Sequence, residues 1–318
     1  MRPPRHDVLA DLTLEGLYRE LTGGGLAGRL FELARDEDLG PHGLDVTSGI
    51  TLEAGERVAA HLRAREAGVV SGLVSLPELC DVFASEAGRV EFETHARDGE
   101  PIEPGQTLAT LTGPTRAVVR LERTMLNLIS RMSGVATRTR RFASAIPDGT
   151  RAKLYDTRKT TPGWRAFEKY AVRCGGGSTH RIGLYDAVLL KDNHLASLSV
   201  GELRARLEAG ARRARAEHEL RFFEVEVDTL EQLDAVLGVE SGLIDVVMLD
   251  NFSVEDLRRG VERRNETGAV VELEASGGVT LDTIGTIATT GVERISVGSL
   301  THHAVSLDLG LDIEPVDR

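Results

Sequence analysis

The second half of the chain alternates regularly between strand-like and helix-like segments, and this alternation constrains the fold most. Six short runs rich in β-branched, aliphatic and aromatic residues predict strands at 153–157, 187–192, 222–228, 245–250, 270–276 and 294–299. Helical segments lie between them at 201–217, 229–237, 254–264 and 281–288. Parallel strands need long crossover connections, which are usually helices. The pattern therefore predicts parallel strands closed into an α/β barrel.

The first third of the chain mixes element types and predicts a small α/β unit. Residues 7–35 look mostly helical, interrupted by GGGLAG at 23–28. That string matches G-x-G-x-x-G, but it follows a helix-like segment where a dinucleotide-binding fold needs a strand. A lone glycine pattern in this context is only weak support for nucleotide binding. Strands are expected in RVEFETH and within 98–114.

A long helix is expected after Ala117. Five apolar residues follow at helical spacing and form one stripe: Leu121, Met125, Leu128, Ile129 and Met132. We interpret this helix as the link between two domains.

Charge and composition exclude several classes of function. The 318 residues carry a formal net charge of −12, which argues against nucleic acid or an anionic membrane as the main partner. No run of about 18 apolar residues occurs, and the N-terminus has no secretion signal. The two cysteines, Cys80 and Cys174, follow no metal or redox spacing, so we expect a cytoplasmic protein in a reducing compartment.

One segment departs from this acidity. The segment from Arg151 to His194 contains nine Lys and Arg residues but only four Asp and Glu residues. A local excess of positive charge in an acidic chain predicts a site for a small anion.

Polar or small residues end each predicted strand. They are Thr157 with Arg158 and Lys159, then Lys191, Glu226, Asp250, Ser276 and Gly298. The carboxyl ends of barrel strands open onto a common mouth, so these side chains can converge although they are distant in sequence. The small residues in EASGG and SVGSL favour phosphate binding, with tight turns as the alternative.

The charged strand ends suit a polyanionic substrate that binds with a divalent metal. Cations contact phosphate and carboxylate oxygens, while Glu226 and Asp250 hold the metal directly or through water. Structural ion pairs are the alternative. Glu224 competes with Glu226, which is preferred because it lies nearer the strand end. His180, beside Arg181, is expected to contact an anion.

Other histidines remain without a firm role. His194 is more consistent with a structural or surface position than with catalysis, and the pair at 302 and 303 has no metal-binding spacing.

Several strings resemble one enzyme family in order and spacing. They are ERTMLNLISRMSGVAT, DTRKTTPGWRAFEKYAVRCGGGSTHR, DAVLLKDNH, EVEVDTLEQL, VVMLDNF and VELEASGGVT, with DLGPHGLDVTS nearer the N-terminus. The chain thereby resembles the nicotinate-nucleotide pyrophosphorylase (carboxylating) family, also called quinolinate phosphoribosyltransferase. The match covers residues from about 117 to 300.

The resemblance implies a fold and a reaction. It implies an N-terminal α/β sandwich at 1–122, an incomplete, open α/β barrel at 123–300, and a tail at 301–318 that packs with the sandwich. It also implies a type II phosphoribosyltransferase that joins quinolinate to 5-phosphoribosyl 1-diphosphate. The products are nicotinate mononucleotide, CO2 and diphosphate, in NAD biosynthesis. Mg²⁺ is implied, and no organic cofactor.

Roles for individual residues follow from the same resemblance. The implied quinolinate and phosphate contacts are Arg158, His180, Arg181 and Lys191, with Lys159 and Lys191 near the diphosphate-bearing substrate. Glu226 and Asp250 resemble metal and ribose contacts, and Ser276, Gly277 and Gly298 resemble a phosphate cradle. The implied catalytic residues are Lys159, Lys191, Glu226 and Asp250. Arg123 is similar to an arginine that reaches the neighbouring subunit's site in a homodimer or dimer-based hexamer.

Two alternatives stay open at this point. One is a paralogue of the same fold associated with molybdenum transport, whose substrate need not be quinolinate. The other, from a different class, is a catalytically silent anion-binding or regulatory module. Placement of Glu226 and Asp250 far from the basic residues would favour the second.

Overall fold

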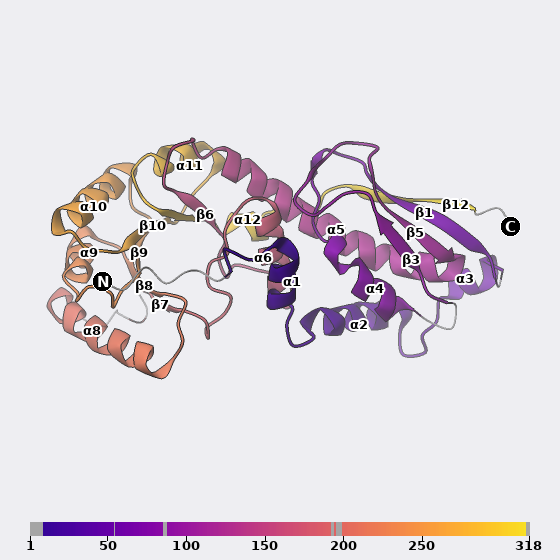
Figure 1. The fold of residues 1–318 in the computed structure, drawn as a ribbon, viewed down its shortest axis with the longest axis horizontal. Helices are drawn as coiled ribbons and strands as arrows, with labels where there is room; N and C mark the ends of the chain where they lie inside the picture. The colour runs from indigo at the N-terminus through magenta and orange to yellow at the C-terminus, as the bar shows by residue number, and fades with distance from the viewer. Residues whose placement is uncertain (1–8, 54, 85–87, 192–193, 195–198, 316–318) are drawn as a thin grey trace. The chain divides into compact units, whose positions relative to one another are not determined.

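The computed structural model describes residues 9–53, 55–84, 88–191, 194 and 199–315 (Figure 1). The chain divides into two compact units. One, the parallel-sheet unit, contains Arg141–Thr160 and Gly177–Ser299. The other, the antiparallel-sheet unit, contains Leu12–Arg140, Thr161–Gly176 and the segment that begins at Leu300. Residues 123–140 and 161–176 thus group with the antiparallel sheet.

The antiparallel-sheet unit combines a four-stranded sheet with helices. Its sheet has the order β12-β1-β5-β3, and a separate pair joins β2 to β4. The strands are β1 (Arg57–Ala64), β2 (Gly68–Val69), β3 (Glu91–Thr94), β4 (Pro101–Ile102), β5 (Thr107–Pro114) and β12 (Leu309–Pro315). Every second residue of β1 is buried, as expected for a sheet with one covered face. β12 pairs with β1, so the end of the chain completes this sheet. Residues 316–318 of the predicted tail lie outside the described residues.

The helices of this unit follow the apolar patterns of the sequence. They are α1 (Leu14–Leu21), α2 (Leu26–Leu39), α3 (Val46–Thr51), η1 (Leu73–Ser75), α4 (Leu76–Phe83), α5 (Thr115–Ser144) and α6 (Arg165–Cys174), and α12 spans Ser299–His302. The five residues of the predicted stripe on α5 are all buried. Gly24 and Gly25 adopt positive φ between α1 and α2. The three glycines 23–25 therefore separate the two helices, while Leu26 already belongs to α2.

The parallel-sheet unit contains a six-stranded parallel sheet with the order β6-β11-β10-β9-β8-β7. Its strands are β6 (Lys153–Tyr155), β7 (Val188–Leu190), β8 (Phe223–Val227), β9 (Val246–Asp250), β10 (Glu272–Ser276) and β11 (Arg294–Ser296). All six lie within predicted strands. Asp192, at the end of one of them, lies outside the described residues. β6 and β7 do not pair, so the barrel is open, as the family resemblance implied.

Helices connect the strands and line the outside of the curved sheet (Figure 1). They are α8 (Val200–Glu217), α9 (Leu230–Leu237), α10 (Val254–Thr267) and α11 (Leu281–Ala288). Each of them begins at a Ser or Thr residue that caps the first turn: Thr229 accepts from Gln232 N, Ser253 accepts from Asp256 N, and Ser199 and Thr280 form capping boxes. Such caps satisfy N–H groups that have no partner inside the helix. The local sequence therefore defines where each crossover helix starts.

Side chains join the two edges of the open sheet. Ser178 pairs with Tyr155 and extends the sheet beyond β6. The Arg221 guanidinium donates to the carbonyl oxygens of Thr179 and His180, at 3.2 and 3.3 Å, and to the Asp186 carboxylate at 3.1 Å. Arg221 and Asp186 lie two residues before β8 and β7, whereas Thr179 and His180 follow Ser178, which pairs with β6, so this contact connects both sides of the opening.

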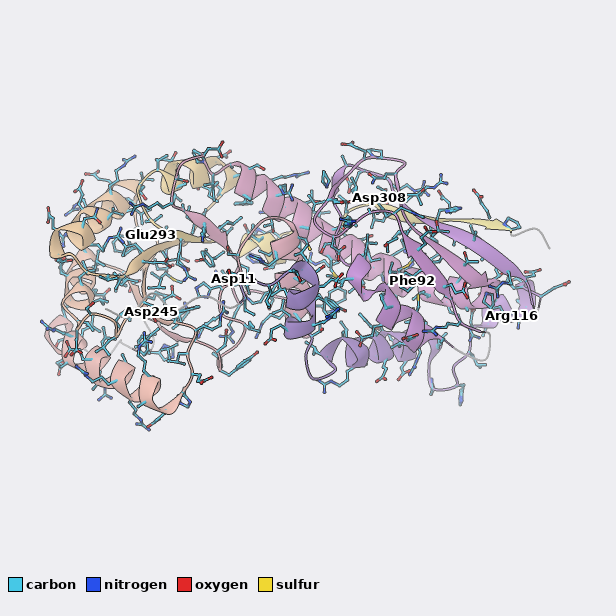
Figure 2. The ribbon with its side chains drawn as sticks, viewed as in Figure 1. Asp11, Phe92, Arg116, Asp245, Glu293 and Asp308 are labelled. Carbon is cyan, nitrogen blue, oxygen red and sulfur yellow. The ribbon has the colours of Figure 1, made fainter. Side chains whose placement is uncertain are left out.

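Charged residues at the amino ends of the strands are already paired within the protein. Asp245, before β9, accepts from Phe223 N at 2.6 Å and from the Arg215 guanidinium of α8 at 2.5 Å (Figure 2). Glu293, before β11, accepts from Leu273 N and the Arg264 guanidinium of α10, both at 2.9 Å. These carboxylates link strands to helices by hydrogen bonds, as expected at the amino ends of barrel strands, where residues mainly stabilise the fold. The candidate functional residues lie at the carboxyl ends of the strands.

In the described part of the chain, no helix is both long and apolar enough to cross a membrane.

Candidate active site

Lys191 and Glu226 form an ion pair at the carboxyl ends of neighbouring strands. Lys191 directly follows β7, and its ammonium group donates to the Glu226 carboxylate of β8. The Glu226 side chain is 6% exposed, whereas that of Lys191 is 43% exposed. Lys191 can therefore turn toward a bound anion, while Glu226 stays within the barrel. His194, whose Nδ1 accepts from Lys191 N at 3.0 Å, supports the chain just beyond this strand.

Asp250 and Ser276 lie side by side at the ends of β9 and β10, where they are register partners. Glu226 pairs with Met248, two residues before Asp250, so both carboxylates lie on the same face of the sheet on adjacent strands. Asn251 donates its side-chain amide to Asp250 at 2.7 Å. The structure therefore brings the predicted acidic residues together beside Lys191. This placement is the opposite of the one that would favour a silent anion-binding module.

Arg158 and Lys159 follow β6, at the same end of the sheet. Arg158 is half-buried, and its Nε atom is buried without a hydrogen-bond partner among the described residues. The Lys159 N–H donates to Thr157 Oγ1 at 3.0 Å, which shapes the turn, and Lys159 itself is exposed. A buried guanidinium N–H without an acceptor is costly, so Arg158 is suited to an anionic ligand.

Glycines at the ends of β10 and β11 expose backbone to the same region. Gly277 has φ +88° and Gly278 has φ +60°, and both are exposed. Gly298 follows β11, where Val297 N donates to Tyr155 O of β6 at 3.0 Å. Backbone N–H groups near a barrel's carboxyl ends are a common way to hold phosphate.

His180 and Arg181 are both buried, at 4% and 7% exposure. The His180 N–H donates to the Asp156 carboxylate at 2.8 Å, and the Arg181 N–H donates to His180 Nδ1 at 2.8 Å. These contacts fix the main chain that presents Arg181.

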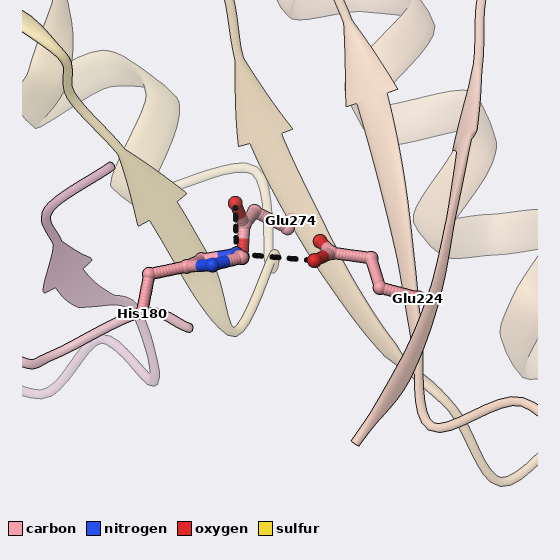
Figure 3. Close-up of side chains that lie close together, drawn as sticks. All are labelled: His180, Glu224 and Glu274. Carbon is pink, nitrogen blue, oxygen red and sulfur yellow. Dashed lines mark ion pairs between the residues drawn. The ribbon is translucent and has the colours of Figure 1, made fainter. Parts of the chain in front are cut away.

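The His180 ring points into a buried cluster of charged residues (Figure 3). Its Nε2 lies 3.1 Å from Glu224 and 3.4 Å from Glu274. Arg294 of β11 places its Nε 2.8 Å from Glu274, and its guanidinium carbon lies 4.0 Å from the ring centroid of Tyr155.

Sequence reasoning missed most of this cluster. Glu224 was considered only as a rival of Glu226, while Glu274 and Arg294 were not considered. Glutamates inside the otherwise apolar runs FEVEV and ELEAS were the available signal.

The two glutamates of the cluster differ in how easily they ionise. Burial and Glu274 raise the pKa of Glu224. Burial also opposes ionisation of Glu274, but His180 and Arg294 lower its pKa to about 2. Since Nδ1 accepts from the Arg181 N–H, the ring carries its hydrogen on Nε2. Glu274 and Arg294 form a charged pair.

Arg123 belongs to the antiparallel-sheet unit and is exposed on α5. It lines a cavity of about 400 Å³ together with Leu126, Asn127, Ser130 and residues 306–309. The cavity combines this guanidinium with the apolar side chains of Leu126 and Leu307.

Two family models match the chain. The C-terminal domain of quinolinate phosphoribosyl transferase matches residues 135–312, and the N-terminal domain of the same family matches residues 45–133.

Curated relatives cover most of the chain. The chain is 45% identical over 293 residues to the nicotinate-nucleotide pyrophosphorylase [carboxylating] of Mycobacterium leprae, covering 89% of this chain and 98% of that protein. It is 39% identical over 254 residues to a probable enzyme of the same name from Bacillus subtilis, covering 80% and 83%.

Solved structures have the same fold. The nicotinate-nucleotide pyrophosphorylase of Francisella tularensis superposes with a TM-score of 0.78 at 34% identity, covering 91% of this chain and 96% of that one. NadC from Streptococcus pyogenes superposes with a TM-score of 0.80 at 32% identity and the same coverage. Together with the two domain matches and the strand-end residues, these similarities show that the chain belongs to the quinolinate phosphoribosyltransferase family.

Proposed function

We infer that this protein is a quinolinate phosphoribosyltransferase of NAD biosynthesis. It converts quinolinate and 5-phosphoribosyl 1-diphosphate to nicotinate mononucleotide, CO2 and diphosphate. The observation that carries this inference is the set of cations and carboxylates at the carboxyl ends of one parallel sheet, in a chain that matches both domains of the family.

Fixed positive charge explains how both substrates bind. Quinolinate brings two carboxylates and the sugar donor brings several phosphate charges, so a partly dry site needs cations for both. We assign quinolinate and phosphate contacts to Arg158, Arg181 and Lys191, with Lys159 and Lys191 nearest the diphosphate. The unpartnered Nε of Arg158 and the exposed ammonium of Lys191 support this assignment.

The carboxylates of Glu226 and Asp250 suit the transfer of the ribosyl group. Departure of diphosphate develops positive charge on the ribose, as in other glycosyl transfers. Glu226 and Asp250, on adjacent strands, can stabilise that charge and contact the ribose hydroxyls. We assign Ser276, Gly277 and Gly298 to the sugar 5-phosphate, because small residues at these strand ends let an anion approach the backbone N–H groups.

Loss of CO2 requires little further machinery. Once its nitrogen is ribosylated, the pyridine ring is cationic, and this charge stabilises the carbanion left by the departing adjacent carboxylate. We therefore propose that no organic cofactor takes part. The protein needs mainly to orient the ring.

We propose Mg²⁺ as the metal. Mg²⁺ is commonly held by one or two carboxylates together with substrate phosphates, and the donor set of Asp250 and Glu226 fits that chemistry. Asp250 is the freer of the two, since Glu226 is paired with Lys191. When bound, Mg²⁺ would neutralise charge on the diphosphate leaving group.

We also propose a homodimer, or a hexamer built from dimers, in which Arg123 contributes to the partner's site. Support comes from the exposure of Arg123 beside a cavity that contains apolar side chains. A cytoplasmic location is proposed because both cysteines are free and buried, which is usual in reducing compartments.

One assay tests the reaction. Purified protein incubated with carboxyl-labelled quinolinate, the sugar donor and Mg²⁺ should release labelled CO2 in proportion to nicotinate mononucleotide formed. Omitting the sugar donor is the control, since decarboxylation depends on ribosylation. Absence of CO2 from folded protein over a prolonged incubation would reject this function.

A further inference from the structure

Four ionisable side chains are buried together inside the parallel sheet. His180 is 4% exposed, Glu224 and Glu274 are 0% exposed, and Arg294 is 6% exposed. Burying charge is expensive, and apolar replacements of buried ion pairs are often no less stable. The cluster therefore calls for an explanation beyond stability.

Both nitrogens of the His180 ring face groups of the protein. Nε2 faces Glu224 at 3.1 Å and Glu274 at 3.4 Å, and Nδ1 accepts the Arg181 N–H at 2.8 Å. The ring also packs edge-on against Phe222 and Tyr155, with centroids 5.2 and 6.3 Å away. Figure 3 shows the ring directed at the two glutamates. In this arrangement Nε2 is directed at two buried carboxylates of the protein, and Nδ1 at the main chain of Arg181.

The same contacts restrain the main chain on both sides of the ring. Asp156 accepts the His180 N–H, and Arg221 donates to the carbonyl oxygens of Thr179 and His180. The ring adds a third restraint at the Arg181 N–H. Nε2 faces Glu224 of β8 and Glu274 of β10. The ring therefore connects the Arg181 main chain to these two strands, which sets the position of Arg181 relative to the sheet.

We propose that His180 is a positioning residue for Arg181, anchored by Glu224 and Glu274, and that it does not itself contact quinolinate. This rests on the proposed function only in naming quinolinate as the ligand of Arg181. It replaces the direct contact first expected for His180. The advantage is preorganisation, since displacement of a binding group by about 1 Å can cost roughly a hundredfold in rate.

Arg294 explains why the cluster is not a cation site, although its three ligand atoms lie within 4.8 Å of one another. The guanidinium contacts Glu274 at 2.8 Å and stacks over Tyr155 at 4.0 Å, so a positive charge is built in. The role of Arg294 is to keep Glu274 ionised, so that the Glu274 carboxylate faces His180 Nε2 as a fixed negative charge.

The first test uses the unaltered protein and needs no turnover. Nitrogen-15 NMR of selectively labelled histidine reports which ring nitrogen carries hydrogen. The signal of His180 is assigned by its shift in Glu224→Gln, which keeps an acceptor oxygen for Nε2. We expect hydrogen on Nε2 and none on Nδ1, both in free protein and with saturating quinolinate. A protonated Nδ1 in either state would overturn the proposal. The result is independent of the CO2 assay, so the two inferences can fail separately.

The second test compares two substitutions of the ring. His180→Asn retains an acceptor oxygen near the Nδ1 position, whereas His180→Gln reaches the Nε2 position and offers no acceptor near Nδ1. Positioning through Arg181 predicts that the Asn variant keeps kcat/KM for quinolinate about tenfold higher than the Gln variant. KM for the sugar donor should change little in either. Equal or better performance of the Gln variant would contradict the proposal. Circular dichroism checks folding, and should neither variant fold, the NMR result decides.

Discussion

Gly277, at the end of β10, lies directly against Asn251, at the end of β9. A Cβ on Gly277 would meet the Asn251 side-chain Cγ at 2.6 Å and its backbone nitrogen at 2.9 Å. Asn251 N also donates to Ser276 O at 2.9 Å. The carboxyl ends of β9 and β10, which we propose bind substrate, are therefore joined by a hydrogen bond. They approach so closely that a side chain larger than that of glycine would clash at position 277.

Gly277→Ala should reduce kcat/KM for the sugar donor by at least about tenfold, because Asn251 and the adjacent Asp250 must move. Gly278→Ala is the matched control. Both positions have positive φ and share that strain, but nothing lies within 4 Å of a Cβ on Gly278. Steady-state kinetics with varied sugar donor, alongside melting temperatures, would separate the two. Equal losses would show that backbone strain alone is responsible.

Lys191→Ala should lower kcat/KM by about a hundredfold or more, since an ammonium group that faces developing negative charge is lost. The fold should persist, because Lys191 is 43% exposed. Arg213→Ala is the control, as it removes an exposed ion pair with Glu217 on α8, away from the strand ends. The CO2 assay and thermal unfolding provide the measurements. Near-normal turnover in the Lys191 variant would remove it from the site.

Arg158→Ala should likewise abolish most turnover without unfolding the chain, because its buried Nε has no partner among the described residues. Quinolinate affinity, measured calorimetrically, should fall along with kcat/KM. An unchanged affinity would place Arg158 away from quinolinate and would leave its orphaned Nε unexplained.

Shared sites predict complementation between subunits. Arg123→Ala and Lys191→Ala chains should each be nearly inactive, because each removes a different cation from the same composite site. When the two are unfolded together and refolded, mixed dimers contain one intact site, so up to about a quarter of wild-type activity should return if subunits pair randomly. Each variant refolded alone is the control. No recovery, with mixed dimers demonstrated by mass spectrometry, would mean that Arg123 acts within its own subunit.

The cysteines should resist alkylation in the folded protein. Burial raises the pKa of Cys80 to about 11, and it also raises the pKa of Cys174. The thiolate is the nucleophile, so at pH 8 the folded protein should react with iodoacetamide far more slowly than the protein in denaturant. A raised thiol pKa also means that the folded state binds more protons than the unfolded state between about pH 9 and 11. Stability should therefore decline as pH rises through that range. Rapid labelling at pH 8 without denaturant would contradict the burial of both thiols.

The strands and crossover helices could be predicted because their causes are local. A strand such as β8, buried along its whole length, must be apolar on the face that the helices cover, and Ser or Thr caps mark where α8, α9 and α10 begin. Parallel strands also place their carboxyl ends at one edge, so the position of a charged residue at the end of a strand-like run is enough to make it a candidate.

The buried cluster could not be predicted in the same way. Glu224 and Glu274 lie 50 positions apart and meet His180 only because β8 and β10 flank β9 and direct alternate side chains inward. Their ionisation depends on mutual distance and burial, which depend on strand order and register. The sequence by itself determined the elements, their parallel sense and the polar strand ends, since these follow from periodicity and local capping. Only the tertiary structure decided that His180 faces Glu224 and Glu274 while its other nitrogen accepts from Arg181, because long-range pairing alone brings those charges within hydrogen-bonding distance.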